Sequence, residues 1–151
     1  MIRLTLPYPV SANRYWRQFF NPRARHVMQG PSTEAQSYKR EVASIARQAG
    51  IRTPLVGRVE VRYWLVPHAP SDAQKRARLD PDAWDLGVQC LDLDNAQKVL
   101  MDSLKGVVFE DDRLVHRIVA ERAAPGQKGL IVEIEPFTPS WLRDKPTPLN
   151  G

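Results

Sequence analysis

This sequence has little cysteine, no long apolar run and no acidic residue among its first thirty positions. Its one cysteine, Cys90, excludes an intrachain disulfide and a zinc site built on several cysteines. Charged residues or proline interrupt every apolar stretch before the ~20 residues that a membrane-spanning helix needs. The segment from Met1 to Pro7 also lacks the apolar centre of a secretion signal. We therefore expect a cytoplasmic protein with no membrane partner.

The absence of acids leaves the first thirty residues strongly basic. The whole formal excess of +5 is carried there by five arginines: Arg3, Arg14, Arg17, Arg23 and Arg25. Aromatic side chains are interleaved with them, at Tyr8, Tyr15, Trp16, Phe19 and Phe20. A basic, aromatic arm favours binding to nucleic acid, so the last four arginines are candidate phosphate contacts. The alternative is that the aromatic residues belong to the core and the arginines are simply solvated.

The spacing of apolar residues predicts an α+β domain with the element order β-α-β-α-β-β. Alternation of apolar and polar residues predicts strands at 2–6, 59–65, 114–121 and 130–135. Helical spacing predicts a helix that begins at a capping box of Thr33 and Gln36 and ends at Gly50. A second helix is expected between Asp92 or Asp94 and Gly106. Glycine and proline at 125–129 predict a hairpin between the last two strands. We expect one mixed sheet with both helices packed on it.

A chain of 151 residues is most simply a single domain, which we place at residues 1–136. Within it, residues 7–31 are expected to form a long loop or arm, and residues 68–91 a surface insertion. Residues 137–151 are expected to be a proline-rich tail. The insertion holds three further basic residues that we count as candidate DNA contacts, although a solvated loop would explain them equally: Lys75, Arg76 and Arg78.

Carboxylates gather in two short segments, Asp92-Leu93-Asp94-Asn95 and Glu110-Asp111-Asp112, and Lys98 follows Asp94 by one helical turn. Because like charges repel unless a cation lies between them, this pattern predicts a divalent-metal site. Mg²⁺ or Mn²⁺ would polarise a phosphoryl oxygen and help to deprotonate an attacking water, while Lys98 would stabilise the developing charge. The alternative is that the aspartates only cap a helix and form a turn.

In this order, these residues resemble the RusA family of Holliday junction resolvases, which are found in bacteria and their phages. The resemblance is carried by Asp92-Leu93-Asp94-Asn95-Ala96-Gln97-Lys98, by Asp111-Asp112 after the helix, and by Ser11-Ala12-Asn13-Arg14-Tyr15 near the start. It covers residues 2 to 136. One departure is that members of the family often carry arginines directly before the first aspartate, where this chain has Val88-Gln89-Cys90-Leu91.

The resemblance implies a magnesium-dependent, homodimeric endonuclease that nicks four-way DNA junctions symmetrically during recombination and repair. Asp92 and Asp94 would be catalytic metal-binding aspartates, joined by Asp111 or Asp112, of which we favour Asp112. Lys98 would be the catalytic lysine, and we place Asn13 and Tyr15 among the DNA contacts. Two alternatives stay open: a non-catalytic DNA-binding protein, and a metal nuclease that acts on other branched DNA or on RNA.

Overall fold

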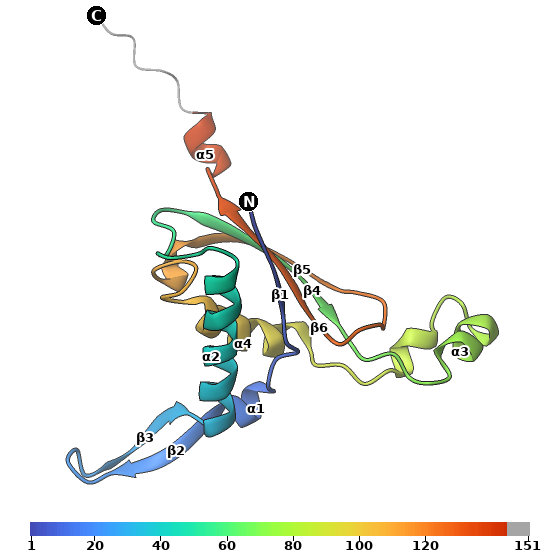
Figure 1. Cartoon of the computed structure of the whole chain (residues 1–151), viewed down its shortest axis with the longest axis horizontal. Helices are drawn as coiled ribbons and strands as arrows, with labels where there is room; N and C mark the ends of the chain where they lie inside the picture. Colours follow the sequence, from blue (N-terminus) through green and yellow to red (C-terminus); the bar gives the residue numbers. More distant parts are fainter. Residues whose placement is uncertain (145–151) are drawn as a thin grey trace, which may run out of the picture.

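A computed structural model describes residues 1–144 and contains a four-stranded sheet with two long helices against one face (Figure 1). The strands are β1 (Ile2–Leu6), β4 (Val59–Val66), β5 (Val115–Arg122) and β6 (Gly129–Pro136), in the spatial order β1-β6-β4-β5. β4 is parallel to β5 and antiparallel to β6, which also pairs antiparallel with β1. The helices are α2 (Thr33–Gln48) and α4 (Leu93–Leu104). The predicted α+β architecture with a mixed sheet is confirmed.

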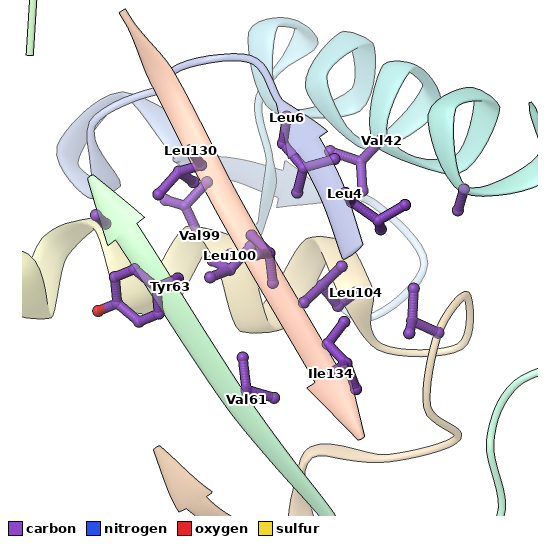
Figure 2. Packing of buried hydrophobic residues seen from close by; sticks show 14 of the residues in the cluster. Leu4, Leu6, Val42, Val61, Tyr63, Val99, Leu100, Leu104, Leu130 and Ile134 are labelled. Carbon is purple, nitrogen blue, oxygen red and sulfur yellow. The ribbon is translucent and has the colours of Figure 1, made fainter. Parts of the chain in front are cut away.

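The core lies between the sheet and the two helices (Figure 2). β4 and β6 contribute every second residue to it, as the sequence alternation predicts, and α2 and α4 contribute residues at helical spacing. Among the fully buried side chains are Val61, Tyr63, Leu65, Leu130, Ile134, Val42, Leu100 and Leu104. The opposite face of the sheet carries charged side chains such as Glu60, which pairs with Arg62 and Arg117. Only one face of the sheet is therefore available for helix packing.

The predicted hairpin between the last two strands is wrong, because β4 lies between β5 and β6. β4 is the most buried strand, so pairing both of its edges satisfies its backbone groups. The connection at 123–128 crosses the end of β4 and is held there by hydrogen bonds from Ala123 N to Leu65 O and from Gly126 N to Pro67 O. Such a segment easily bridges two strand spacings, about 10 Å.

The two helices begin and end close to their predicted limits. The N-cap of α2 is Ser32, one residue before the predicted Thr33, and its hydroxyl accepts a hydrogen bond from Ala35 N at 3.1 Å. Gly50 follows the helix with a φ of +90°, which favours glycine. α4 begins after Asp92 and is followed by Gly106 with a φ of +76°.

Residues 7–31 are more ordered than predicted. A short helix α1 (Ala12–Tyr15) leads into a two-stranded hairpin of β2 (Trp16–Asn21) and β3 (His26–Pro31), which extends away from the rest of the molecule (Figure 1). The side chain of Asn21 accepts hydrogen bonds from Arg23 N and Ala24 N and so stabilises the turn. The sequence does not predict β2 and β3, because neither strand has a buried face and so neither shows a clear alternation of apolar and polar residues.

The insertion at 68–91 extends away from the hairpin side of the molecule (Figure 1) and contains α3 (Ala73–Leu79) and a 3-10 helix at Trp84–Gly87. At the other end of the chain, Phe137 N donates to Arg58 O, and α5 (Ser140–Arg143) follows. The predicted tail is thus helical at 140–143, and its part at 145–151 lies outside the described residues. No helix within residues 1–144 is long and apolar enough to cross a membrane.

Candidate active site

One side of α4 is polar and faces away from the core. The buried side consists of Ala96, Val99, Leu100, Ser103 and Leu104. Asp94, Lys98 and Lys105, the residue that follows the helix, are exposed and fall on the other side, at intervals of four and seven residues. Residues four apart on a helix lie one above the other, so Asp94 and Lys98 are neighbours on this polar stripe.

Asp92 and Asp94 occupy the N-terminal turn of α4. Asp92 is at the N-cap position, but its carboxylate makes no capping hydrogen bond. Within residues 1–144, neither carboxylate has a hydrogen bond or an ion pair. The helix N-terminus carries a partial positive charge, which stabilises both anions in place. The cap that sequence analysis offered as an alternative role is therefore not formed by the Asp92 side chain, and both carboxylates are free to bind a cation.

Tyr63, at the centre of β4, fixes the position of this first turn. Its hydroxyl lies 3.1 Å from Leu93 O and 3.1 Å from Gln97 Oε1, and it can donate its proton to either. Burial, and after it the negative charge of Asp94, raises the pKa of Tyr63 to about 12. The phenol therefore stays protonated at neutral pH and ties the acidic end of α4 to the sheet.

The second acidic segment returns beside α4, and its two aspartates have different surroundings. Asp111 accepts a hydrogen bond from Arg113 N at 3.0 Å and lies 3.9 Å from Lys105 Nζ. The Arg113 N–H, followed by the Asp112 carboxyl and the Lys105 charge, lowers the pKa of Asp111. Asp112 instead lines a cavity together with Lys98. Asp111 thus performs the turn role, and Asp112 is the better candidate for a third functional carboxylate.

The cavity beside α4 has a volume of about 350 Å³. Lys98 and Asp112 were expected to be site residues from the sequence, whereas five other lining residues were not: Trp16, Gln97, Met101, Asp102 and Lys105. Trp16 comes from the hairpin, so a segment far away in sequence forms one wall of the site. Asp102 lies one turn beyond Lys98 on the same stripe, and that spacing is the one signal by which sequence analysis could have found it.

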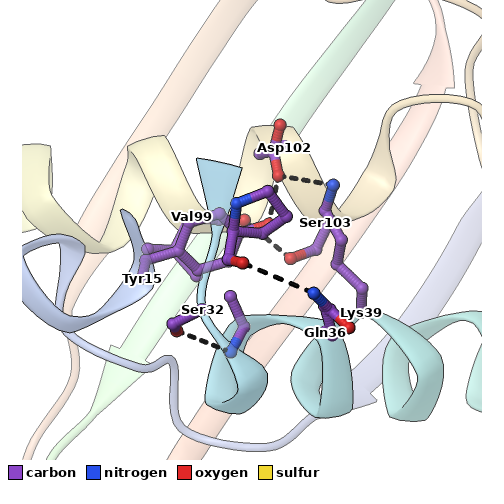
Figure 3. Close-up of polar contacts among 9 residues, drawn as sticks. Tyr15, Ser32, Gln36, Lys39, Val99, Asp102 and Ser103 are labelled. Carbon is purple, nitrogen blue, oxygen red and sulfur yellow. Dashed lines mark hydrogen bonds and ion pairs between the residues drawn. The ribbon is translucent and has the colours of Figure 1, made fainter. Parts of the chain in front are cut away.

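Asp102 of α4 contacts side chains of α1 and α2 and so connects these three helices (Figure 3). Its carboxylate accepts a hydrogen bond from the Tyr15 hydroxyl and lies 2.8 Å from Lys39 Nζ. Burial, and next the hydrogen bond to Asp102, raises the pKa of Tyr15, so the phenol remains a donor. Asp102 is paired with Lys39 and not with Lys98. Lys98 has no ion pair in the described part of the chain, so its ammonium group is available to a phosphate in the cavity.

Further hydrogen bonds fix the root of the hairpin to this helix. Asn95, within the Asp-Leu-Asp-Asn motif, accepts a hydrogen bond from Ala12 N at 2.6 Å. Ser32, directly after β3, holds this end of the hairpin to α1, since its N–H donates to Tyr15 O at 2.7 Å and its hydroxyl donates to Arg14 O at 2.6 Å. The wall formed by Trp16 is therefore firmly connected to α4.

Tyr15→Phe is expected to destabilise the protein by about 1.5–3 kcal/mol, because it removes a hydrogen bond to a charged acceptor. Tyr38→Phe is the matched control, since the Tyr38 hydroxyl donates to a neutral acceptor, Pro7 O, and should cost about 1 kcal/mol. Urea unfolding of both variants measures the difference. Equal losses would show that Tyr15 does not hold Asp102.

The acidic side chains do not enclose a metal by themselves. Within residues 1–144, no three His, Cys, Asp or Glu side chains lie close enough together to form such a group. Magnesium seldom requires that arrangement, because it keeps several waters and is commonly bound by one or two carboxylates together with substrate phosphates. Asp92 and Asp94, two residues apart, fit this kind of open site, which would be completed by a bound phosphate.

The predicted DNA contacts lie on both sides of α4. Arg17, Arg23 and Arg25 belong to the exposed hairpin, and Asn13 and Arg14 are exposed at its root. Tyr15 is fully buried, which removes its side chain from the predicted DNA contacts. Its role is structural, as the partner of Asp102.

The remaining basic candidates, Lys75, Arg76 and Arg78, lie on α3. Arg76 pairs with Asp72 at 2.9 Å and also lines a cavity of about 700 Å³ with Lys128, His68 and residues 87–91. The insertion therefore folds a basic side chain back beside Val88–Leu91, the segment that directly precedes Asp92.

The chain is similar to known proteins over most of its length. Residues 7–135 match the family model described as Endodeoxyribonuclease RusA. A protein named Crossover junction endodeoxyribonuclease RusA from Escherichia coli O139:H28 (strain E24377A / ETEC) is 33% identical over 128 residues, which cover 83% of this chain and 87% of that protein. The protein of the same name from Escherichia coli (strain K12) is 34% identical over 119 residues, covering 77% of this chain and 79% of that protein.

Proposed function

Because this chain belongs to the RusA family of endodeoxyribonucleases, we propose that it resolves Holliday junctions by magnesium-dependent hydrolysis of phosphodiester bonds. The observation that carries the proposal is the group of unpaired charges on one side of α4, where Asp94 and Lys98 are neighbours and Asp112 shares a cavity with Lys98. Such an arrangement can hold a cation and a phosphate side by side.

Each charged residue has a distinct role in this proposal. Asp92 and Asp94 would hold Mg²⁺, or Mn²⁺ in its place, together with the phosphate of the cut strand, and Asp112 would join them only once that phosphate is bound. The bound metal supplies Lewis-acid polarisation of the phosphoryl oxygen and lowers the pKa of a bound water. Lys98 stabilises the extra negative charge that the phosphate gains in the transition state. Tyr63 and Asn95 keep the first turn of α4 in position.

Two copies of the chain act together in this proposal. A four-way junction has two-fold symmetry, so paired symmetrical nicks require two active sites that are related by a two-fold axis, as in a homodimer. The basic hairpin and the basic face of α3 lie on either side of α4 in Figure 1, where they can follow two DNA arms away from one cut. Phosphate contacts of this kind supply most of the affinity for DNA.

Removing two hairpin charges, by Arg23→Gln with Arg25→Asn, should weaken junction binding and flatten its salt dependence. Asparagine is chosen because Arg25 has a φ of +55°, which asparagine tolerates. The slope of log K against log salt should fall by about two units if each arginine meets one phosphate. Binding titrations at several salt concentrations measure it.

The control for that pair is Arg47→Gln with Arg52→Asn, which removes the same charge from exposed positions at and after the end of α2. If the control flattens the slope as much as the hairpin variant does, the effect belongs to net charge and the hairpin has no special contact with DNA.

The proposed function is tested by incubating the protein with a four-way junction, a flap and a linear duplex, each with and without magnesium. The proposal requires cutting of the junction that depends on the metal. Binding without cutting under all conditions would favour a non-catalytic DNA-binding protein, and preferred cutting of the flap would favour a nuclease of other branched DNA.

A further inference from the structure

The hairpin formed by β2 and β3 has two different faces. Cross-strand pairing aligns Phe20 with Val27 and Trp16 with Pro31, and strand alternation places Trp16, Phe20 and Val27 on the same face. The cross-strand pair of Gln18 and Gln29 lies between Trp16 and Phe20 on this face. We name Trp16, Phe20 and Val27 the apolar stripe. We propose that this stripe stacks on nucleobases that are exposed at the branch point of the junction and thereby distinguishes branched DNA from duplex. The inference rests on the proposed function.

The other face of the hairpin is packed on itself. The Arg17 guanidinium lies 5.7 Å from the centre of the Phe19 ring, and Asn21 Nδ2 donates to Met28 Sδ at 3.0 Å. Phe19 also covers Gly30 so closely that a Cβ there would be 2.9 Å from its ring. Phe19 and Met28 on this face are 40% and 37% exposed. In the stripe, Trp16 is 36% exposed, and Phe20 and Val27 are each 60% exposed. Large apolar side chains exposed side by side indicate a binding surface.

The stripe begins at the candidate active site. Trp16 lines the same cavity as Lys98 and Asp112, and Phe20 lies four residues further along the strand, a distance of about 13 Å. Trp16 is itself held by an edge-on contact with Tyr15, at 4.8 Å between ring centres. The Tyr15 hydroxyl donates a hydrogen bond to Asp102 of α4. A DNA strand whose phosphate is bound at Lys98 would therefore contact the aromatic rings of the stripe where it leaves the cavity.

Charge favours DNA over a second copy of the hairpin as the occupant of the stripe. Arg23 and Arg25 lie in the turn between β2 and β3, next to Phe20 and Val27, and the chain has no acidic residue before Glu34. Two such hairpins placed face to face would bring like charges together, whereas a phosphate backbone would neutralise them. Aromatic side chains surrounded by arginines are the common arrangement for unpaired nucleotides, because every base offers a face for stacking.

Only branched or unpaired DNA offers such faces. In a continuous duplex each base pair is covered by the next one, whereas at a branch point a base can be unstacked at lower cost. The arginines are expected to bind phosphates in either kind of DNA. The apolar stripe should thus add affinity for the junction alone, and it should leave the salt dependence of binding unchanged.

The test is Phe20→Leu, which keeps apolar bulk but removes the aromatic ring. Its matched control is Phe19→Leu, the same change one residue earlier on the packed face. Binding is measured without metal, on a junction that carries 2-aminopurine at the branch point and on a linear duplex. We expect Phe20→Leu to bind the junction about fivefold or more weakly, with duplex binding and salt slope unchanged. The wild type and Phe20→Trp should alter the 2-aminopurine fluorescence, and Phe20→Leu should not.

Junction affinity and fluorescence of Phe20→Leu equal to those of the wild type would overturn the inference. So would an equal loss of affinity for duplex, or a lower molecular mass of the variant in analytical ultracentrifugation, which would make the stripe a contact between copies. Because these measurements need no cutting, they are distinct from a failure of the proposed function, which would show as binding and fluorescence changes without any cleavage.

Discussion

Asp94→Asn is expected to reduce cleavage of a four-way junction by about a thousandfold or more, because the loss of one metal-binding carboxylate removes several kcal/mol of transition-state stabilisation. Asparagine has the same shape as aspartate and is accepted in a first helical turn. Asp94 is exposed, and among residues 1–144 its side chain has no hydrogen bond whose loss would weaken the fold. Gel assays of junction cleavage with magnesium in excess measure the loss.

Thermal unfolding separates metal binding from folding for the same variant. A ligand that binds only the folded state raises the melting temperature, so magnesium should stabilise the wild type. Asp94→Asn should lose that gain and should melt close to the temperature of the wild type without metal, since the lost repulsion from Asp92 and the lost attraction to the helix N-terminus oppose each other. Asp82→Asn, an exposed aspartate of the insertion, should keep both the gain and the activity. An undiminished gain in Asp94→Asn would remove Asp94 from the metal site.

Lys98→Ala is expected to lower the cleavage rate by two to three orders of magnitude, about the loss seen when one preorganised charge is removed from a transition state. The side chain is exposed on the polar stripe of α4, away from Val99 and Leu100, so the core does not need it. Melting temperature and junction affinity should stay near those of the wild type. Single-turnover cleavage and binding titrations measure the two quantities separately.

Lys105→Ala is the comparison for Lys98→Ala, because it removes a lysine from the same helix and the same cavity. Lys105 is already close to Asp111, at 3.9 Å, so its loss should affect the rate far less. Equal effects of the two variants would mean that the cavity needs positive charge in general and no particular lysine. A Lys98→Ala protein that cuts normally would exclude a catalytic role for Lys98.

The fold could be predicted from sequence wherever one face of an element is buried. Alternation along β4 and helical spacing along α2 and α4 reflect such burial, and their limits were predicted to within a few residues. The order of β5 and β6 could not be predicted in this way. Glycine and proline at 125–129 indicate that the chain reverses, but they do not reveal which strand lies alongside after the reversal.

The candidate site likewise contains residues that could be predicted from the sequence and residues that could not. The spacing of Asp92, Asp94 and Lys98 is local, so one helical turn brings them together whatever the rest of the fold does. The different surroundings of Asp111 and Asp112 depend on how the loop after α4 returns, and local spacing does not predict that path. Trp16 and Tyr15 join the site from far away in sequence, through the pairing of Tyr15 with Asp102.

The most direct measurement of the central claim is a map of the cuts that the wild-type protein makes in a four-way junction with each strand labelled in turn. We expect cuts only when magnesium or manganese is present, and we expect them in pairs at positions related by the symmetry of the junction. The Asp94→Asn variant should make no such cuts. Cuts that persist without metal, or that fall on a linear duplex as readily as on the junction, would contradict it.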